Sequence, residues 1–216
     1  MSELKLAVVL SEPFMENTYL AWRPGRHDCL VFDPGLEPDK IFAALEQRGL
    51  EPALIIDTHG HADHIGGNAA MKERWPDCPL LIGRGDAPML TDPWLNLSAQ
   101  YGTQIVSPEA DRLLDEGERV EAAGFSLEVR DIPGHSPGHI VLVDHDTSPV
   151  HVFGGDVLFA GSIGRTDFPG GSLVQLLTGI RDKLYTLADD TVVLPGHGPE
   201  TTVGQERATN PFTRRM

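Results

Sequence analysis

A short segment rich in metal-ligand side chains, His59-Gly60-His61-Ala62-Asp63-His64, directly follows an apolar run at residues 53–57. The apolar run predicts a buried strand, and residues 68–75 after the segment predict a helix. On an extended chain, His59 and His61 point to the same side because side chains repeat every two residues, and the following turn presents Asp63 and His64 from another direction. This spacing allows the four side chains to be divided between two metal ions rather than crowded on one.

Three later residues of the same chemical classes also follow apolar strand-like runs: His135 in PGHSPGH, Asp156 in FGGDVLF and His197 in LPGHGP. Each lies beside glycine, so we expect the side chains to converge at one edge of the sheets. This recurrence disfavours the alternative that the first segment is merely a solvated polar loop. Imidazole and carboxylate ligands suit zinc, iron or manganese, whereas a structural zinc site rich in thiolates would need cysteine here.

Strand-like runs and helical patterns alternate along the whole chain. Strands are expected at residues 4–10, 17–22, 28–32, 53–57, 118–122, 125–132, 139–144, 150–155 and 191–196, and helices at 37–48, 68–75 and 172–187. Residues 80–118 are harder to assign, because LLIG suggests a short strand but prolines and acidic residues interrupt the rest. With no linker or repeat, we expect an α/β (α+β) fold with packed sheets, helices outside, and one domain over residues 1–216.

Composition narrows the function classes. The formal charge of −15 disfavours nucleic acid as a partner, since phosphate binding requires clustered lysine and arginine. No basic, apolar leader and no run of about 20 apolar residues is present, so we expect a cytoplasmic protein without a membrane partner. Cys29 and Cys78 are expected to be packed, reduced thiols.

The order of these motifs resembles the metallo-β-lactamase fold superfamily over essentially the whole chain. The resemblance implies a four-layer αββα sandwich with two divalent metal ions at one edge, zinc being favoured over iron or manganese. It further implies that His59, His61 and His135 bind one metal, that Asp63, His64 and His197 bind the other, and that Asp156 bridges them. Because metal-bound water has its pKa lowered to about 7, hydroxide becomes available to attack a carbonyl. In this scheme Asp63 also orients the metal-bound water.

The glycine-rich segment at 161–171 and the ending GHGPETTVGQERATNPF resemble small glyoxalase II-like hydrolases, relatives of hydroxyacylglutathione hydrolase, and the Gly-Arg-Thr-Asp-Phe run at 164–168 also resembles persulfide dioxygenases. The resemblance to glyoxalase II-like hydrolases implies hydrolysis of a small thioester such as S-lactoylglutathione. The chain departs from full-length glyoxalase II, because residues 198–216 leave no room for the C-terminal helical domain that contacts glutathione. The substrate and the glutathione-contacting residues are therefore not transferred by the resemblance.

Other functions stay open on the same scaffold. A persulfide dioxygenase would bind one iron through His59, His135 and Asp156, and a lactonase would retain hydrolysis. An exported β-lactamase is disfavoured by the lack of a signal peptide. A non-catalytic metal-binding protein is also disfavoured, because it would require a degenerate ligand set and no position is missing.

Several neighbouring residues are secondary candidates. Arg165 offers a bidentate donor for a substrate carboxylate, and Asp33 at a strand end is a candidate for supporting a ligand histidine. Asp57 is assigned either that supporting role or a capping role, and His139 is expected to be structural. Serine catalysis at Ser136 is disfavoured, because the following proline has no N–H for an oxyanion hole.

Overall fold

Two six-stranded sheets form the centre of the computed structural model, which describes residues 3–214. The first sheet has the strand order β1-β2-β3-β4-β5-β6, with β1 (Lys5–Ser11), β2 (Glu16–Trp22), β3 (Asp28–Phe32), β4 (Glu51–Asp57), β5 (Leu80–Gly83) and β6 (Arg112–Leu114). The second has the order β14-β13-β10-β9-β8-β7, with β7 (Arg119–Ala122), β8 (Phe125–Asp131), β9 (Ile140–Asp144), β10 (His151–Gly155), β13 (Val192–Pro195) and β14 (Thr201–Thr202).

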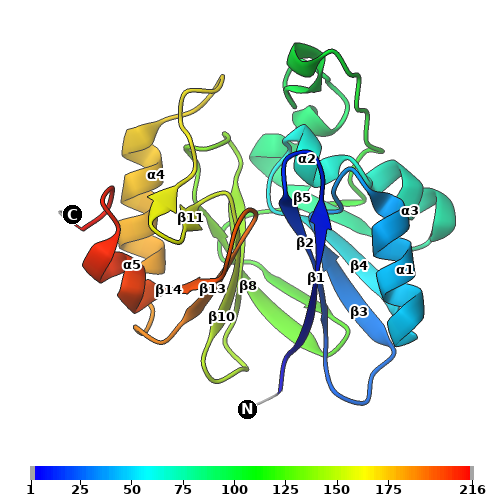
Figure 1. Ribbon diagram of the computed structural model, residues 1–216, viewed down its shortest axis with the longest axis horizontal. Helices are drawn as coiled ribbons and strands as arrows, with labels where there is room; N and C mark the ends of the chain where they lie inside the picture. The colour runs from blue at the N-terminus through cyan, green and yellow to red at the C-terminus, as the bar shows by residue number, and fades with distance from the viewer. Residues whose placement is uncertain (1–2, 215–216) are drawn as a thin grey trace.

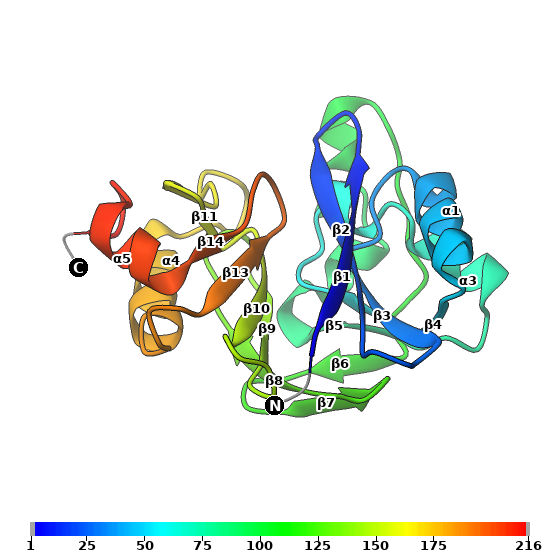
Figure 2. The same cartoon turned by 60° about the horizontal axis from the view of Figure 1, so that its bottom comes forward.

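Helices cover the outer face of each sheet, which gives the four layers expected from the resemblance (Figure 1). In chain order the helices are α1 (Pro38–Arg48), α2 (Ala62–Ile65), α3 (Asn68–Arg74), α4 (Leu173–Gly179) and α5 (Val203–Thr209). Both views place α1 and α3 outside the first sheet and α4 and α5 outside the second (Figure 2). No helix within residues 3–214 combines the length and apolar character that crossing a bilayer requires.

Alternating strand residues build a separate apolar core between each pair of layers. In β3, Leu30 and Phe32 face the core between the two sheets, whereas Val31 faces the core beneath α1. Strands buried on both faces are therefore apolar at successive positions, as the sequence pattern predicted. Phe32 stacks on Phe153 of the second sheet, with ring centroids 3.8 Å apart, and so joins the two halves of the sandwich.

The segment between β5 and β6 has little regular structure, which explains why its sequence was difficult to assign. It contains two short 3-10 helices, η1 (Arg84–Leu90) and η2 (Ser98–Tyr101), with Pro88 inside the first. A two-stranded hairpin, β11 (Leu158–Phe159) and β12 (Ser162–Ile163), lies at the other side of the molecule. Figure 1 shows the green η2 region above the first sheet and the yellow β11 region beside the second.

The single helix predicted over residues 172–187 is wrong in its second half. The α-helix ends at Gly179 and continues as a π-helical turn, η3 (Ile180–Leu184). A Cβ at Gly179 would lie 2.6 Å from Ile132 Cγ2, so the helix packs closely against the chain there. Leu176, Ile180 and Leu184 nevertheless all face the core, as their spacing predicted.

Cys29 and Cys78 are free and buried, as expected from the sequence. Burial raises the pKa of the Cys29 thiol to about 12 and that of Cys78 to about 11. Both cysteines therefore serve packing. Reactive cysteines differ from them, because reactivity needs a lowered thiol pKa.

Candidate metal centre

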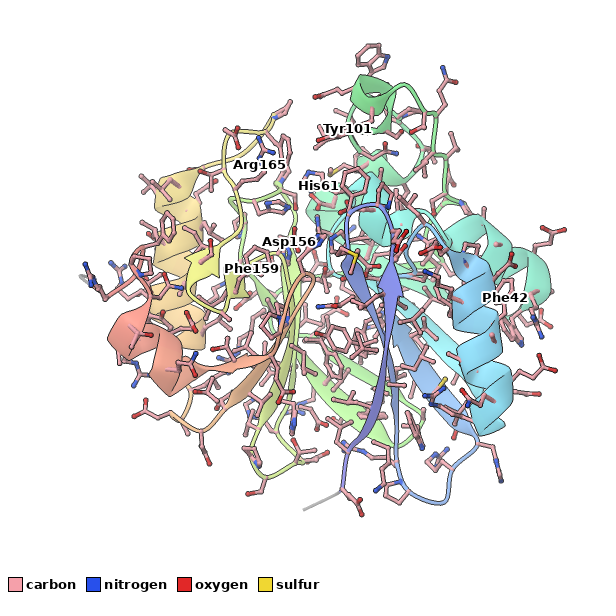
Figure 3. All side chains as sticks on the ribbon, in the orientation of Figure 1. Phe42, His61, Tyr101, Asp156, Phe159 and Arg165 are labelled. Carbon is pink, nitrogen blue, oxygen red and sulfur yellow. The ribbon has the colours of Figure 1, made fainter. Side chains whose placement is uncertain are left out.

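The ends of four strands carry the predicted ligand residues to one edge of the sandwich. The loop and helix α2 after β4 carry the His59–His64 segment, and His135, Asp156 and His197 follow β8, β10 and β13. His61 and Asp156 face each other between the two halves of the molecule, with Tyr101 and Arg165 beyond them (Figure 3). The structure thus brings together all seven residues that the sequence pattern singled out.

His59, His61 and His135 form one compact group. One ligand nitrogen from each lies within 4.8 Å of the others, a spacing that could hold a metal ion. Nδ1 of His61 lies 2.9 Å from Nε2 of His135, and His59 is fully buried with no partner for its Nε2 among the described residues. A buried nitrogen without a partner is costly unless a ligand satisfies it, which fits a metal here.

Asp63, His64 and His197 form a second group of the same kind. Nε2 of His64 lies 3.3 Å from Nε2 of His197, and Oδ2 of Asp63 lies 3.3 Å from that same His197 nitrogen. The group combines two imidazoles and one carboxylate, a donor set that suits zinc, iron or manganese.

Asp156 lies between the two groups. Its Oδ2 is 3.4 Å from Nε2 of His135 in the first group and 3.6 Å from Nε2 of His197 in the second, while its Oδ1 is 3.5 Å from Nε2 of His64. Oδ1 has no hydrogen-bond partner within residues 3–214. A carboxylate in this position can contact ions in both groups.

Hydrogen bonds on the outer side of the ligand histidines set their tautomers. Nδ1 of His135 donates to the backbone carbonyl of Arg165 at 2.8 Å, and Nδ1 of His197 donates to the carbonyl of Phe14 at 3.1 Å. Because a carbonyl only accepts, a proton is on each Nδ1, and each Nε2 faces inward toward the other candidate ligands. This is the arrangement by which surrounding groups orient histidine ligands in metal sites.

Asp33 performs the same task for His64. Its Oδ2 lies 3.1 Å from Nδ1 of His64, and its two oxygens also accept hydrogen bonds from the Thr58 N–H and hydroxyl, at 2.6 and 2.8 Å. Asp33 is 2% exposed, so its orientation is fixed by these bonds. The sequence analysis expected Asp33 to support a ligand histidine, and the structure places it in contact with His64, one of the candidate ligands.

Burial and nearby carboxylates shift the pKa values of the clustered histidines in different directions. Burial lowers the pKa values of His59 and His61 well below the usual range, so both imidazoles stay neutral, as metal ligands must. At His64 burial acts in the same direction, but the nearby Asp63 and Asp156 carboxylates outweigh it and raise the pKa. Negative charge is therefore concentrated around His64, which favours a cation at this position.

Two further buried residues near the candidate ligands, His139 and Asp57, hold neighbouring groups in place. His139 is fully buried, its Nε2 accepts a hydrogen bond from the Asp156 N–H at 2.9 Å, and its ring stacks on His59. Asp57 instead accepts a hydrogen bond from Asn68 at 2.7 Å, at the first residue of α3, and is fully buried. Asp57 therefore anchors a helix start, one of the two roles left open by the sequence.

Asp86 is a residue that sequence reasoning missed. Its carboxylate accepts hydrogen bonds from the Gly60 N–H at 3.0 Å, the Ser136 hydroxyl at 2.5 Å and the Gly138 N–H at 2.6 Å. It therefore ties the loop that carries His59 and His61 to the loop that carries His135. Ser136, fully buried against Asp86, serves this link, consistent with the sequence argument against serine catalysis.

The start of β2 supplies two more residues that no spacing motif indicated. Asn17 donates to two backbone carbonyls on either side of His197, at 2.9 and 2.8 Å, and so holds that loop. Glu16 is fully buried and lies near Asp33 and His64, with burial raising its pKa. Their only sequence signal is that polar residues begin a strand that is otherwise buried and largely apolar.

A pocket of about 620 Å³ opens over the two groups. Its floor includes His61, Asp63, His135, Asp156 and His197, whereas His59 and His64 lie behind it with no exposed surface. The size is that of a site for a small organic molecule. The predicted substrate residue Arg165 also lines the pocket, but its guanidinium pairs with Asp167 at 2.8 and 2.7 Å.

The sequence of the chain is related to hydrolases of similar length. It is 43% identical over 185 residues to the probable metallo-hydrolase YqgX of Bacillus subtilis, a match that covers 85% of this chain and 86% of that one. It is 33% identical to the hydroxyacylglutathione hydrolase GloC of Haemophilus influenzae, over 97% of this chain and 98% of GloC.

Two solved structures share this fold over nearly the full length of both chains. The BLEG-1 B3 metallo-β-lactamase superposes with a TM-score of 0.91 at 35% identity, covering 96% of this chain and 99% of that structure. TTHA1623 in a di-iron-bound form superposes with a TM-score of 0.85 at 37% identity, covering 95% and 99%. The family model described as the metallo-beta-lactamase superfamily matches residues 11–197, a span that contains every candidate ligand. The chain therefore belongs to the metallo-β-lactamase superfamily of metal-dependent hydrolases.

Proposed function

We propose that this protein hydrolyses small thioesters in the manner of glyoxalase II, with two divalent metal ions bound by the residues described above. The observation that carries the proposal is the position of Asp156, within 3.6 Å of ligand nitrogens from both groups, at the floor of a pocket. One ion would be held by His59, His61 and His135 and the other by Asp63, His64 and His197, with Asp156 shared. Zinc is the favoured metal, and iron or manganese fit the same donors.

Divalent ions in this donor set supply Lewis-acid activation of water and of a carbonyl oxygen. The chain contributes the fixed positions of the ligands, through hydrogen bonds from the outer nitrogens of His64, His135 and His197. Asp63 lines the pocket with a side chain that is 20% exposed, so water in the pocket can reach it. Burial works against ionisation of Asp63, but His64 and His197 outweigh it and lower its pKa, which keeps the carboxylate a hydrogen-bond acceptor that can orient the attacking water.

The lining of the pocket also favours a particular leaving group. Apart from the residues of the two ligand groups and Asp156, the charged side chain that lines it is Arg165, which is already paired with Asp167. No carboxylic acid or lysine among the described lining residues is left to protonate a departing group. A thiol, with an ordinary pKa of about 8.5, can leave as the thiolate, whereas an amine would need a proton.

The relationship to GloC supports the same reaction, because GloC is named for hydrolysis of hydroxyacylglutathione and matches nearly the full length of this chain. The similarity to the BLEG-1 β-lactamase supports a second candidate activity, hydrolysis of a β-lactam amide. Because a thiolate leaves without a proton and an amine does not, the pocket favours the thioester over the β-lactam. A lactonase and a persulfide dioxygenase are the alternatives that the sequence resemblance left open, and the similarity to ETHE1 from Myxococcus xanthus, with a TM-score of 0.76 at 26% identity, supports the second.

The proposal is tested by comparing substrates on one preparation with a known metal content. S-lactoylglutathione, a β-lactam, a lactone and glutathione persulfide are assayed in parallel, the last by oxygen uptake. We expect thioester cleavage to exceed β-lactam and lactone cleavage, with no oxygen uptake, and to fall by at least about 100-fold in Asp63→Ala. The exposed His27→Gln variant serves as the matched control. Oxygen uptake with one iron per chain, or unchanged turnover in Asp63→Ala, would overturn the proposal.

A further inference from the structure

The pocket above the ligand groups has walls that are apolar on both sides of the molecule. Six of the residues that line it are Phe14, Leu36, Tyr101, Ile105, Phe159 and Phe168. Figure 3 shows Tyr101 on the side of the first sheet and Phe159 on the side of the second, with His61 and Asp156 between them. Apolar walls from two separate halves of the fold enclose the place where a substrate must lie.

The aromatic residues at the rim remain partly open to solvent. Phe14 is 40% exposed and Tyr101 is 57% exposed, and their rings meet edge to face with centroids 5.5 Å apart. Exposed aromatic surface beside a pocket can gain apolar contact when a ligand covers it. The rim therefore offers a place for an apolar group that extends away from the ligand groups.

Three polar side chains in the wall of the η2 region, those of Asn96, Ser98 and Thr103, have their hydrogen bonds within the wall. Asn96 donates to the carbonyls of Met89 and Ile105, at 3.0 and 2.9 Å, and its Oδ1 accepts from the Ser98 N–H. Ser98 Oγ accepts from the Ile105 N–H at 3.0 Å, and Thr103 donates to the Ser98 carbonyl at 3.2 Å. A substrate could bind these groups only by displacing existing bonds, which contributes little net affinity.

Arg165 is the charged side chain of the wall, and its guanidinium already has an ionic partner. It forms a bidentate pair with Asp167 and lies 4.0 Å over the Phe168 ring. A substrate carboxylate that reached Arg165 would replace Asp167 as its partner. Exchanging one exposed ion pair for another adds little to the affinity for a substrate, because each such pair stabilises by only about 0–1 kcal/mol. The described walls thus lack the free cations that would select a tripeptide with two carboxylates.

We infer that the pocket selects its substrate by an uncharged, apolar group, such as a medium-length alkyl or aryl chain, rather than by a glutathione tripeptide. The inference rests on the thioester hydrolysis proposed above and specifies its substrate class. The ligand groups recognise the reacting carbonyl, and the aromatic walls recognise the chain attached to it. Glutathione is then one tolerated thiol among several.

The test uses thioethers, which cannot be hydrolysed, so the result does not depend on turnover. Four ligands combine a methyl or a hexyl group with glutathione or with uncharged N-acetylcysteamine, and calorimetry measures their affinities for the metal-loaded protein. Each fully buried methylene contributes about a fourfold gain. We expect hexyl to bind at least about 30-fold more tightly than methyl on either carrier, and glutathione to differ from N-acetylcysteamine by less than about threefold.

Variants at the rim of the pocket test whether the gain in affinity from the hexyl group arises there. Phe14→Ser with Tyr101→Ser is expected to reduce the hexyl gain at least about fivefold, whereas Phe212→Ser, which changes an equally exposed phenylalanine outside the pocket lining, leaves it unchanged. The inference is overturned if the tripeptide improves affinity as much as or more than the hexyl group does. Absence of thioester turnover together with a hexyl preference would reject the proposed reaction but retain the apolar pocket.

Discussion

The backbone N–H of Asp156 donates a hydrogen bond to Nε2 of His139 at 2.9 Å, and both groups are buried. Because Nε2 accepts, the His139 proton is on Nδ1. The same imidazole stacks on His59, with ring centroids 4.7 Å apart and planes inclined by 17°. One histidine outside the predicted ligand set thus contacts both Asp156, the carboxylate proposed to be shared, and His59, a proposed ligand of the first group.

His139→Leu should weaken metal binding without removing any proposed ligand. The Asp156 N–H would lose its acceptor inside the protein, at a cost of about 1–3 kcal/mol in the free energy of unfolding. Loss of such a supporting contact typically lowers metal affinity by about 10- to 100-fold. Metal titration and urea unfolding measure the two effects, with His27→Leu at the surface as the control. Unchanged metal affinity would show that His139 does not position Asp156.

Asp86→Ala should loosen two ligand-bearing loops together. Three donors, from Gly60, Ser136 and Gly138, would lose their shared acceptor. We expect the free energy of unfolding to fall by about 3 kcal/mol or more, because buried unpaired donors each cost about 1–3 kcal/mol. Urea unfolding of the metal-free protein gives this value, with exposed Asp77→Ala as the matched control. A loss no larger than that of the control would contradict the role assigned to Asp86.

The two buried thiols predict a loss of stability at alkaline pH. Cys29 and Cys78 ionise at about pH 12 and 11 in the folded protein, but near 8.5 when unfolded. The unfolded state therefore releases protons that the folded state retains, so their stabilising contribution is complete below about pH 8.5 and declines above it. Between about pH 9 and 11, ionisation of the two thiols should lower the free energy of unfolding by up to about 2.7 kcal/mol per pH unit.

Urea unfolding across that pH range under reducing conditions measures the slope. The Cys29→Ala, Cys78→Ala double variant should show a shallower decline, although its stability at pH 7 is lower because two core side chains are shortened. Equal slopes in the two proteins would mean that the thiols ionise in the folded state. The remaining groups that titrate at alkaline pH are common to both proteins and cancel in the comparison.

Much of the fold follows from local sequence patterns, and the missing parts have physical reasons. The run at 53–57 predicted a buried strand, because burial on both faces makes successive positions apolar, and the run at 28–32 predicted a strand beside it. The two-residue strand β14 was not predicted because it is too short to show a period, and helix α5 was not predicted because its buried residues, Val203 and Glu206, do not form an apolar face. The π-helical turn at Ile180–Leu184 keeps the apolar spacing of an ordinary helix, so sequence alone does not reveal it.

The proposed ligands were identifiable because histidine and aspartate recur in short motifs at strand ends. Asp86 carries no such signal. It lies in a 3-10 helix interrupted by proline, and its partners are 26, 50 and 52 residues away along the chain. Asn17 lies about 180 residues from the His197 loop that it holds. Contacts of this kind depend on how the two sheets pack, and no local pattern encodes them.

The central claim is that two ions share Asp156, and metal stoichiometry tests it most directly. Protein saturated with zinc and then freed of excess metal is analysed for zinc per chain in three forms: wild type, His197→Gln and the surface variant His27→Gln. His197 belongs to the second group alone, so its loss should leave the first ion in place. We predict two ions per chain in the wild type and in His27→Gln, and one in His197→Gln. A single ion in the wild type, or the same content in all three, would contradict the account.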